Sequence, residues 1–226
     1  MSTTVVGKPF AWSYSQLKNW ETCPKRYFHY NVAKDVVEPE SAQLKEGNAL
    51  HAAFEARVKS NTELPLGFTH HEALLASIIN APGVVYAEQK LAMTSSFTPT
   101  AFFSKTAWLR SVLDCTKVNE TTATTLDWKT GKPSHDMTQM QLAAATLFCH
   151  QPKVNRVKVA LVFVNHDEVE SGEFVREDLP EIWGEILPRV KLVEQARAKQ
   201  EYPPKPSGLC KRYCAVVSCP YHGRGQ

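Results

Sequence analysis

The sequence predicts an α/β protein in which helices flank a central mixed β-sheet, with a helical N-terminal part and a cysteine-rich C-terminal tail. Three observations support this. Apolar residues recur at helical spacing over residues 42–58 and 137–148. Strand-like stretches at 108–118 and 122–128 are joined by a short polar loop, which is typical of a hairpin. The apolar run 157–164 then follows the 137–148 helix, so a strand, a helix and a buried strand form a crossover.

Length and composition bound the possibilities. The 226 residues, 43% of them hydrophobic and 22% charged, can bury one core, so we expect a single domain over 1–226. No run of eighteen or more apolar residues occurs, and the first residues lack the pattern of a secretory signal. We therefore expect a cytoplasmic protein without membrane contact, in a bacterium or a phage-infected cell. A net charge of +3 is compatible with a nucleic-acid partner without requiring one.

The N-terminal part, residues 1–83, is expected to be helical. Ser13 or Ser15 can cap a first helix that Pro24 breaks or kinks. The helix at 42–58 contains Gly47, and an interior glycine usually reflects a close approach of another chain segment. A further apolar-periodic helix is expected at 71–80.

The remaining chain divides into three parts. The sheet-bearing core covers 84–165, with a further strand at 84–88 and a polar, aromatic loop at 94–105. Residues 166–201 are assigned to the C-terminal helix, of which 182–200 is amphipathic. Residues 202–226 form the cysteine-rich tail.

Two acids and a lysine carry the chemistry of the predicted hairpin. Asp127 and Lys129 are two residues apart on a strand, so they share a face, while Leu126 and Trp128 face the opposite, buried side. An ordinary surface ion pair would explain Asp127 and Lys129 alone. Asp114 lies on the preceding strand, however, where hairpin pairing would bring it beside Asp127. Two close carboxylates favour a bound magnesium or manganese ion, with Lys129 orienting a water or stabilising developing charge.

Four motifs occur in an order that resembles one family. They are Gly47 with His51 four residues later, Ser111 followed by Asp114, the run Asp127-Trp128-Lys129-Thr130-Gly131, and Gln139 with Ala143 four residues later. In these motifs the chain is similar to the PD-(D/E)XK nuclease superfamily, and within it to the RecB-type exonucleases, including CRISPR-associated and phage members. The resemblance covers nearly the whole chain. Ser111 replaces the family's glycine, and Ala143 replaces the tyrosine of its last motif.

The resemblance implies a restriction-endonuclease-like core and a metal-dependent deoxyribonuclease. Such an enzyme would hydrolyse phosphodiester bonds of single-stranded or end-frayed DNA in recombination, repair or DNA processing, with helicase or recombination proteins as partners. The implied ligands of Mg²⁺ or Mn²⁺ are His51, Asp114, Asp127 and the backbone carbonyl of Trp128. Lys129 is then catalytic with the two aspartates, and Gln139 helps to place water or DNA. Glu88 is a further candidate, as an auxiliary acid near the metal.

The tail contains three cysteines within ten residues, Cys210, Cys214 and Cys219, which predicts a metal or cluster in a reducing compartment. The family resemblance implies a 4Fe-4S cluster completed by Cys23, although the middle cysteine lies one position later than the family pattern. The alternatives are structural Zn²⁺ bound by the three tail cysteines and His222, or free thiols. Cys115 and Cys149 are expected to be core residues. The basic residues Lys211, Arg212 and Arg224 beside the cluster can contact the DNA backbone.

Two other functions compete. The substitutions at Ser111 and Ala143 are compatible with a catalytically inactive module that keeps the nuclease fold and binds DNA or a partner. A redox protein built on the cysteine cluster is the third possibility, but no second cofactor motif accompanies the cysteines. Because both acids and the lysine are present, the nuclease is the favoured interpretation.

Overall fold

The computed structural model describes residues 10–224. Its residue contacts divide the chain into two compact units. The sheet unit is Ser41–Ile182, and the terminal unit combines the described residues of Met1–Glu40 and Trp183–Gln226. The two ends of the chain thus form a compact unit of their own, and the single domain expected from length and composition stays a prediction.

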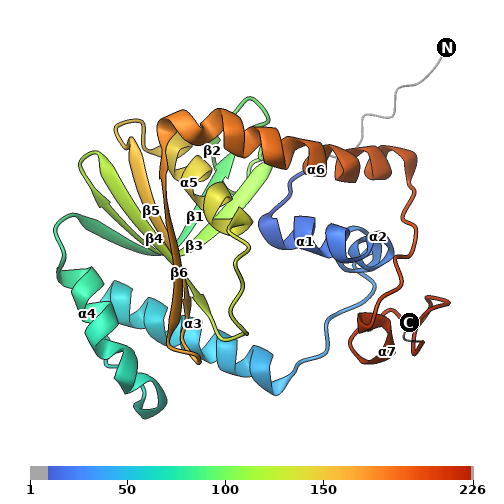
Figure 1. The fold of residues 1–226 in the computed structure, drawn as a ribbon, viewed down its shortest axis with the longest axis horizontal. Coiled ribbons are helices and arrows are strands. Elements are labelled where there is room, and N and C mark those ends of the chain that lie inside the picture. The colour runs from blue at the N-terminus through green and yellow to red at the C-terminus, as the bar shows by residue number, and fades with distance from the viewer. Residues whose placement is uncertain (1–9, 225–226) are drawn as a thin grey trace. The chain divides into compact units, whose positions relative to one another are not determined.

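The sheet unit contains one six-stranded sheet with the strand order β2-β1-β3-β4-β5-β6 (Figure 1). Its strands are β1 Val84–Met93, β2 Pro99–Thr100, β3 Leu109–Asn119, β4 Thr122–Lys129, β5 Arg156–Phe163 and β6 Glu168–Val175. Neighbouring strands pair antiparallel except β4 and β5, which are parallel. The parallel pair requires a crossover, and this is supplied by a helix, as the sequence predicts.

Helices cover both faces of this sheet. They are α3 Ala42–Ser60, α4 Glu72–Asn80 and α5 Thr138–His150, with short 3-10 helices at Leu66–His71 and Arg176–Asp178. On one face, Leu50 and Phe54 of α3 and Leu75 of α4 pack with Leu126 and Trp128 of β4. On the other face, α5 packs against the opposite side chains of β4 and β5. Side chains alternate along β4 and so contribute to both cores.

The terminal unit is made of short helices and most of one long helix. Its elements are α1 Tyr14–Thr22, α2 Pro24–Tyr27, a π-helical segment Phe28–Ala33, most of α6 Leu179–Lys199, and α7 Leu209–Arg212. Ser13 caps α1 through its side chain, as expected for a serine at that position. Tyr27 is fully buried, and the Arg197 guanidinium donates a hydrogen bond to its hydroxyl.

The predicted fold class, an α/β protein with a mixed sheet flanked by helices, is confirmed. Two strands go beyond the prediction. β2 is a two-residue pairing inside the loop that follows β1, and β6 lies within the stretch 166–201 that the sequence assigns to the C-terminal helix. Strand β6 carries mostly exposed or half-buried side chains, so it lacks the apolar signal that identifies β5. In the described part of the chain, no helix has the length and apolar character needed to cross a membrane.

Candidate active site

The strands β3 and β4 separate at two aspartates. Their ladder ends at the pair Cys115 and Leu126, and the next positions on the two strands are Asp114 and Asp127. Beyond that point β3 continues to pair with β1, while β4 continues to pair with β5 as far as Lys129. The backbone N–H of Trp128, which pairs with no β3 residue, donates a 2.8 Å hydrogen bond to Asp114 Oδ2. The hairpin therefore opens where its acids lie.

The neighbouring pair of strands is irregular at the same level. Leu113 packs in the core under α5, whereas Cys115, two residues later, packs in the core under α3. A regular strand would place both side chains on one face. On β1, the residue opposite Asp114 is Glu88, whose φ of 48° is unusual for a non-glycine residue. Backbone conformations of this kind are typical of functional sites, and this one aligns Glu88, Asp114 and Asp127 in a row across three strands.

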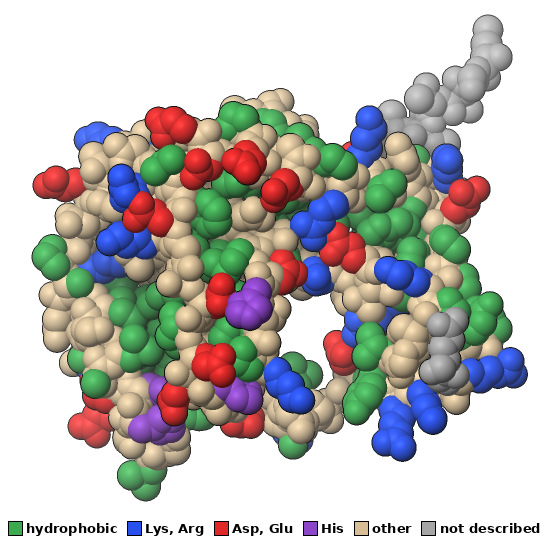
Figure 2. Space-filling model, in the orientation of Figure 1, with side chains coloured by type: hydrophobic (Ala, Val, Ile, Leu, Met, Phe, Trp, Pro, Cys, Tyr) green, Lys and Arg blue, Asp and Glu red, His purple; other side chains and the backbone are tan. Residues whose placement is uncertain are grey.

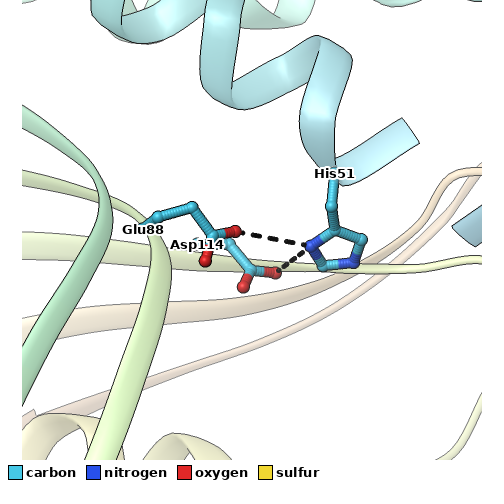
Figure 3. Close-up of side chains that lie close together, drawn as sticks. All are labelled: His51, Glu88 and Asp114. Atoms are coloured by element: carbon cyan, nitrogen blue, oxygen red, sulfur yellow. Dashed lines mark ion pairs between the residues drawn. The ribbon is translucent and has the colours of Figure 1, made fainter. Parts of the chain in front are cut away.

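His51 reaches this row from helix α3. Its Nε2 lies 3.1 Å from the carbonyl oxygen of Trp128. Its Nδ1 points at the carboxylates, 3.4 Å from Asp114 Oδ2 and 3.8 Å from Glu88 Oε1 (Figure 3). A histidine that donates one ring N–H to a carbonyl has its other nitrogen oriented for a metal, as is usual for metal-binding histidines.

Asp127 has a different set of neighbours. One of its oxygens forms an ion pair with Lys129 Nζ, and the other accepts a hydrogen bond from the Gln139 side-chain amide. Lys129 Nζ also donates to Gln139 Oε1 over 2.8 Å. The three side chains, two from β4 and one from the first turn of α5, thus form a closed hydrogen-bonded ring. Asp127 is only 4% exposed, whereas the Lys129 side chain is 34% exposed and accessible to a substrate.

The electrostatics of the row are unfavourable without a cation. Burial, then the charge of Asp127, raises the pKa of Asp114 from 3.8 to about 8, and the charge of Glu88 acts in the same direction. The hydrogen bond from Trp128 N–H and the charge of Lys129 oppose this rise. Buried like charges that stay close are relieved by a proton or a metal ion.

The residues present fit a divalent cation. One nitrogen of His51 and one oxygen each of Glu88 and Asp114 lie within 4.8 Å of one another. Carboxylate oxygens are the ligands that Mg²⁺ and Mn²⁺ prefer, and imidazole accompanies them in many sites. Asp127 is not in this group, because Lys129 and Gln139 hold its carboxylate. Glu88, which the sequence predicts only as a possible auxiliary acid, therefore lies with His51 and Asp114 among the residues that can hold the ion.

The other motif positions are accommodated by packing. A Cβ on Gly47 would lie 3.2 Å from Thr130 Oγ1, so the close approach expected from this helical glycine is to the side chain that follows Lys129. The Ser111 hydroxyl lies 3.0 Å from that of Thr146 on α5, which gives the serine a partner in place of the family's glycine. Ala143 is buried in the α5 core, so no side chain extends from that position towards a substrate.

Some features of the site have no sequence signal. Nothing in the sequence indicates that Glu88 takes a positive φ, or that Trp128 supplies both an N–H to Asp114 and a carbonyl to His51. Backbone groups are the same in every residue, so only the register of the strands could reveal them. Glu88 itself is recognisable as a candidate from its residue type on a strand.

The terminal unit contains a second candidate site. A cavity of about 260 Å³ is lined by Cys23, Cys210, Cys214 and Cys219 together with residues of the tail. Backbone N–H groups point at two of the sulfurs: Lys205 N–H donates to Cys23 Sγ at 3.3 Å, and Ser207 N–H donates to Cys210 Sγ at 3.4 Å. Hydrogen bonds to the sulfurs are among the features that set the potential of an iron-sulfur cluster.

His222 does not line this cavity. The cysteine sulfurs are also widely spaced, because in the described part of the chain no three of them lie within 4.8 Å of one another. A single zinc ion holds its sulfurs at about 2.3 Å and would draw them together. Figure 2 shows lysine and arginine side chains gathered over the α7 part of this unit, where Lys211 and Arg212 are exposed.

Comparison with known proteins gives a family match over nearly the whole chain. A model of the PD-(D/E)XK nuclease superfamily matches residues 11–220. A solved protein of Eubacterium rectale, provisionally described as an exonuclease, is similar at a TM-score of 0.52 and 14% identity, over 100% of this chain and 95% of that chain. The solved structure of SSO0001 has a TM-score of 0.43 and 14% identity, over 97% and 90%. Among curated proteins there is no significant match.

Proposed function

Because the chain belongs to the PD-(D/E)XK nuclease superfamily, we propose that it is a Mg²⁺- or Mn²⁺-dependent deoxyribonuclease, an exonuclease that acts on single-stranded or end-frayed DNA. The observation that carries this proposal is the row of Glu88, Asp114 and Asp127 with Lys129 beside it. The acids and the lysine are all present in hydrogen-bonding positions. A catalytically inactive module has no comparable support, because inactivation of such a site would remove one of these groups.

In this proposal His51, Glu88, Asp114 and Asp127 hold the metal, while the Trp128 carbonyl, which the sequence resemblance implies as a further ligand, accepts a hydrogen bond from His51 Nε2 instead. When bound, the ion would lower the pKa of a water molecule and neutralise phosphate charge. His51 is held by the Trp128 carbonyl, so that its Nδ1 faces the carboxylates. A single backbone residue thereby positions both His51, through its carbonyl, and Asp114, through its N–H.

Lys129 and Gln139 act on the attacking water and the phosphate. In the metal-free protein Lys129 Nζ is bound to Asp127 and Gln139. If a cation shared the Asp127 carboxylate, the ammonium group would be able to donate to the attacking water or to a phosphate oxygen, where it would stabilise the charge that develops. The Gln139 amide, which binds both partners, keeps the lysine at the end of β4.

The test uses purified protein and end-labelled single-stranded DNA. We expect degradation with Mn²⁺ or Mg²⁺ and none with chelator. Asp127→Ala should abolish cleavage, and Asp127→Asn, which keeps an oxygen for the Gln139 amide, should do so with the fold intact. Glu63→Ala, an exposed acid outside the row, is the matched control and should cleave like the wild type. Activity of Asp127→Asn equal to the wild type would refute the assignment, and absence of metal binding by calorimetry would indicate the inactive module.

We also propose that Cys23, Cys210, Cys214 and Cys219 hold a 4Fe-4S cluster. The support is the shared cavity, the N–H groups that point at two sulfurs, and a spacing between the sulfurs that is wider than a single zinc ion would allow. Anaerobically purified protein should be brown and contain iron and sulfide in equal amounts, about four of each per chain. Zinc in place of iron would contradict this assignment.

The wider setting follows from the same proposal. The family match runs through both compact units, which supports a single nuclease domain over 1–226 whose ends pack as a separate unit. A cytoplasmic role in phage or bacterial recombination or repair, with a helicase or recombination partner, stays a prediction. Contacts of Lys211, Arg212 and Arg224 with the DNA backbone belong to it as well.

A further inference from the structure

The two strands that carry Glu88 and Asp114 extend well past the acids. Residues 89–113 complete β1, form the loop with β2 and begin β3, and the ribbon can be followed to β2 in Figure 1. From Cys115 to Val118, β3 pairs with both β1 and β4. From Leu109 to Leu113, β3 pairs with β1 and not with β4. The segment 89–113, which we name the arm, is therefore one wall beside the opening between β3 and β4.

The composition of the arm is unlike the rest of the chain. It contains three basic residues, Lys90, Lys105 and Arg110, and no acid, whereas the chain has 23 acids in 226 residues. It also contains four large aromatic residues, which are Phe97, Phe102, Phe103 and Trp108. Basic side chains interleaved with aromatic rings are the combination that single-stranded nucleic acids require, since the cations follow the phosphates and the rings stack on unpaired bases.

The arm presents part of this set on the side from which His51 reaches Glu88 and Asp114. Side chains alternate along a strand, so Arg110 and Val112 project to the side opposite α5, from which His51 of α3 reaches Asp114. Lys90, which precedes Leu91 of the core under α5, projects to the same side. The alternate residues Ser111 and Leu113 face α5 instead. Arg110 is four residues from Asp114, which corresponds to about 13 Å along the strand. The cation is thus a few nucleotides from the acids.

The aromatic residues continue from Arg110. The Arg110 guanidinium lies over the Phe102 ring, 5.6 Å from its centroid, and the Phe103 ring packs edge-on against Phe102. Phe103 is 79% exposed, although burial of such a side chain is normally favourable. Within the described residues, Lys90, Lys105 and Arg110 form no ion pair with an acid. Cations and rings are therefore available together.

The loop that carries these rings is ordered by its own hydrogen bonds. Thr94 N–H donates to Thr98 O at 2.9 Å, and Trp108 N–H donates to Met93 O at 2.8 Å. The hydroxyls of Thr100 and Thr106 lie 3.0 Å apart. A surface that is ordered before binding loses less conformational entropy when a ligand binds.

From this placement we infer that the arm is a binding track for single-stranded nucleic acid, in which Phe103 stacks on an unpaired base while Lys90, Lys105 and Arg110 contact phosphates. The inference rests on the proposed nuclease function and specifies how a single strand would be recognised at that site. A base pair in a duplex does not expose the face that an aromatic ring needs, so the track favours single strands over blunt duplexes.

The test measures binding in chelator, so that no DNA is cut. Fluorescence anisotropy of a labelled oligothymidylate of about a dozen nucleotides gives the Kd. Phe103→Ala should raise this Kd by roughly 5- to 100-fold, the range expected for one lost base stack. Phe103→Tyr keeps the ring and should restore affinity, whereas Phe103→Leu keeps apolar area without the ring and should not. Leu66→Ala removes a 93% exposed apolar side chain outside the arm and should bind like the wild type.

The outcomes separate the possibilities. An unchanged Kd for Phe103→Ala overturns the inference, as does an equal loss of affinity for a blunt duplex. Restoration by leucine as complete as by tyrosine also overturns it, and would indicate an apolar protein contact instead. If the wild type cleaves DNA with Mn²⁺ but Phe103→Ala binds normally, only the binding track fails. If the wild type does not cleave while the Phe103 series behaves as expected, the proposed catalytic function fails and the track stands.

Discussion

The acidic residues of the sheet unit lie on long strands that belong to a sheet packed under helices, whereas the cysteines of the terminal unit lie on short segments. Asp127 is on an eight-residue strand paired with β5 along its length. Cys210 is on α7, a helix of four residues, and Cys214 and Cys219 follow it outside any regular element. A helix this short has little stability of its own.

This difference indicates which site depends on its metal. The sheet orders the acids against their mutual repulsion, so the proposed metal relieves a strain that the fold already supports. The cysteine cavity has few backbone bonds to order it, so the proposed cluster would hold the segments together. Removing the metal should therefore change function in the sheet unit and structure in the terminal unit.

The largest expected effect is on catalysis. Lys129→Met removes the ammonium group but keeps much of the aliphatic chain, and should lower kcat on single-stranded DNA by on the order of 100- to 1,000-fold. The circular dichroism spectrum and iron content should remain those of the wild type. Lys59→Met, which removes an exposed lysine from the end of α3, is the control and should retain activity. A Lys129→Met enzyme with wild-type kcat would show that the lysine has no part in the reaction.

The next largest effect is expected from Asp114→Asn, which should stabilise the metal-free protein. A pKa raised from 3.8 to about 8 means that the folded state binds a proton at Asp114 that the unfolded state releases. The free energy of unfolding of the wild type should therefore fall as pH rises from about 4 to about 8, by at most about 6 kcal/mol from this group.

Asp114→Asn removes that pH dependence. The variant keeps an oxygen for the Trp128 N–H, and its stability advantage over the wild type should grow between pH 4 and 8 and then level off. Urea denaturation in chelator at several pH values measures this difference. A constant difference across the window would show that the Asp114 carboxyl is not disfavoured in its ionised form.

A smaller effect is expected from the cysteines. Cys219→Ser should remove the cluster and lower the stability of the purified protein by about 3 kcal/mol, seen as a fall in Tm of roughly 10 °C. Cys149→Ser, whose thiol lies on α5 and contacts Phe97 O, should keep iron and colour. If Cys219→Ser retains full iron content and Tm, the tail cysteines do not hold a cofactor, and the contrast between the two units is lost.

The smallest effect concerns the glycine of α3. Gly47→Ala gains helix propensity of roughly 1 kcal/mol, but its methyl group would lie 3.2 Å from Thr130 Oγ1. Stability should thus change by less than about 1 kcal/mol in thermal unfolding, while a displaced Thr130 disturbs Lys129 and lowers kcat. Gly184→Ala, on α6 with open space around it, should leave kcat unchanged. Equal kcat for both alanine variants would exclude the contact with Thr130 as a functional one.

The fold class, the hairpin with its crossover helix, and the residues of the acid, acid, lysine set all follow from the amino-acid sequence. Periodicity identifies elements that bury one face, because burial dictates where apolar residues recur. Strand β6 escapes such a prediction because it is largely exposed, and its assignment depends on pairing with β5. The order of the motifs identifies the superfamily because the type and spacing of the side chains can be read from the sequence.

How those residues meet is visible only in three dimensions. The fold places Glu88 opposite Asp114 in a strained backbone. The carbonyl and the N–H of Trp128 bind His51 and Asp114. The Asp127 carboxylate is bound by Lys129 and Gln139. It also sets Lys90 and Arg110 of the arm on the side of the sheet from which His51 reaches Glu88 and Asp114. These features depend on strand register and on backbone groups, which every residue shares, so no local pattern in the sequence specifies them.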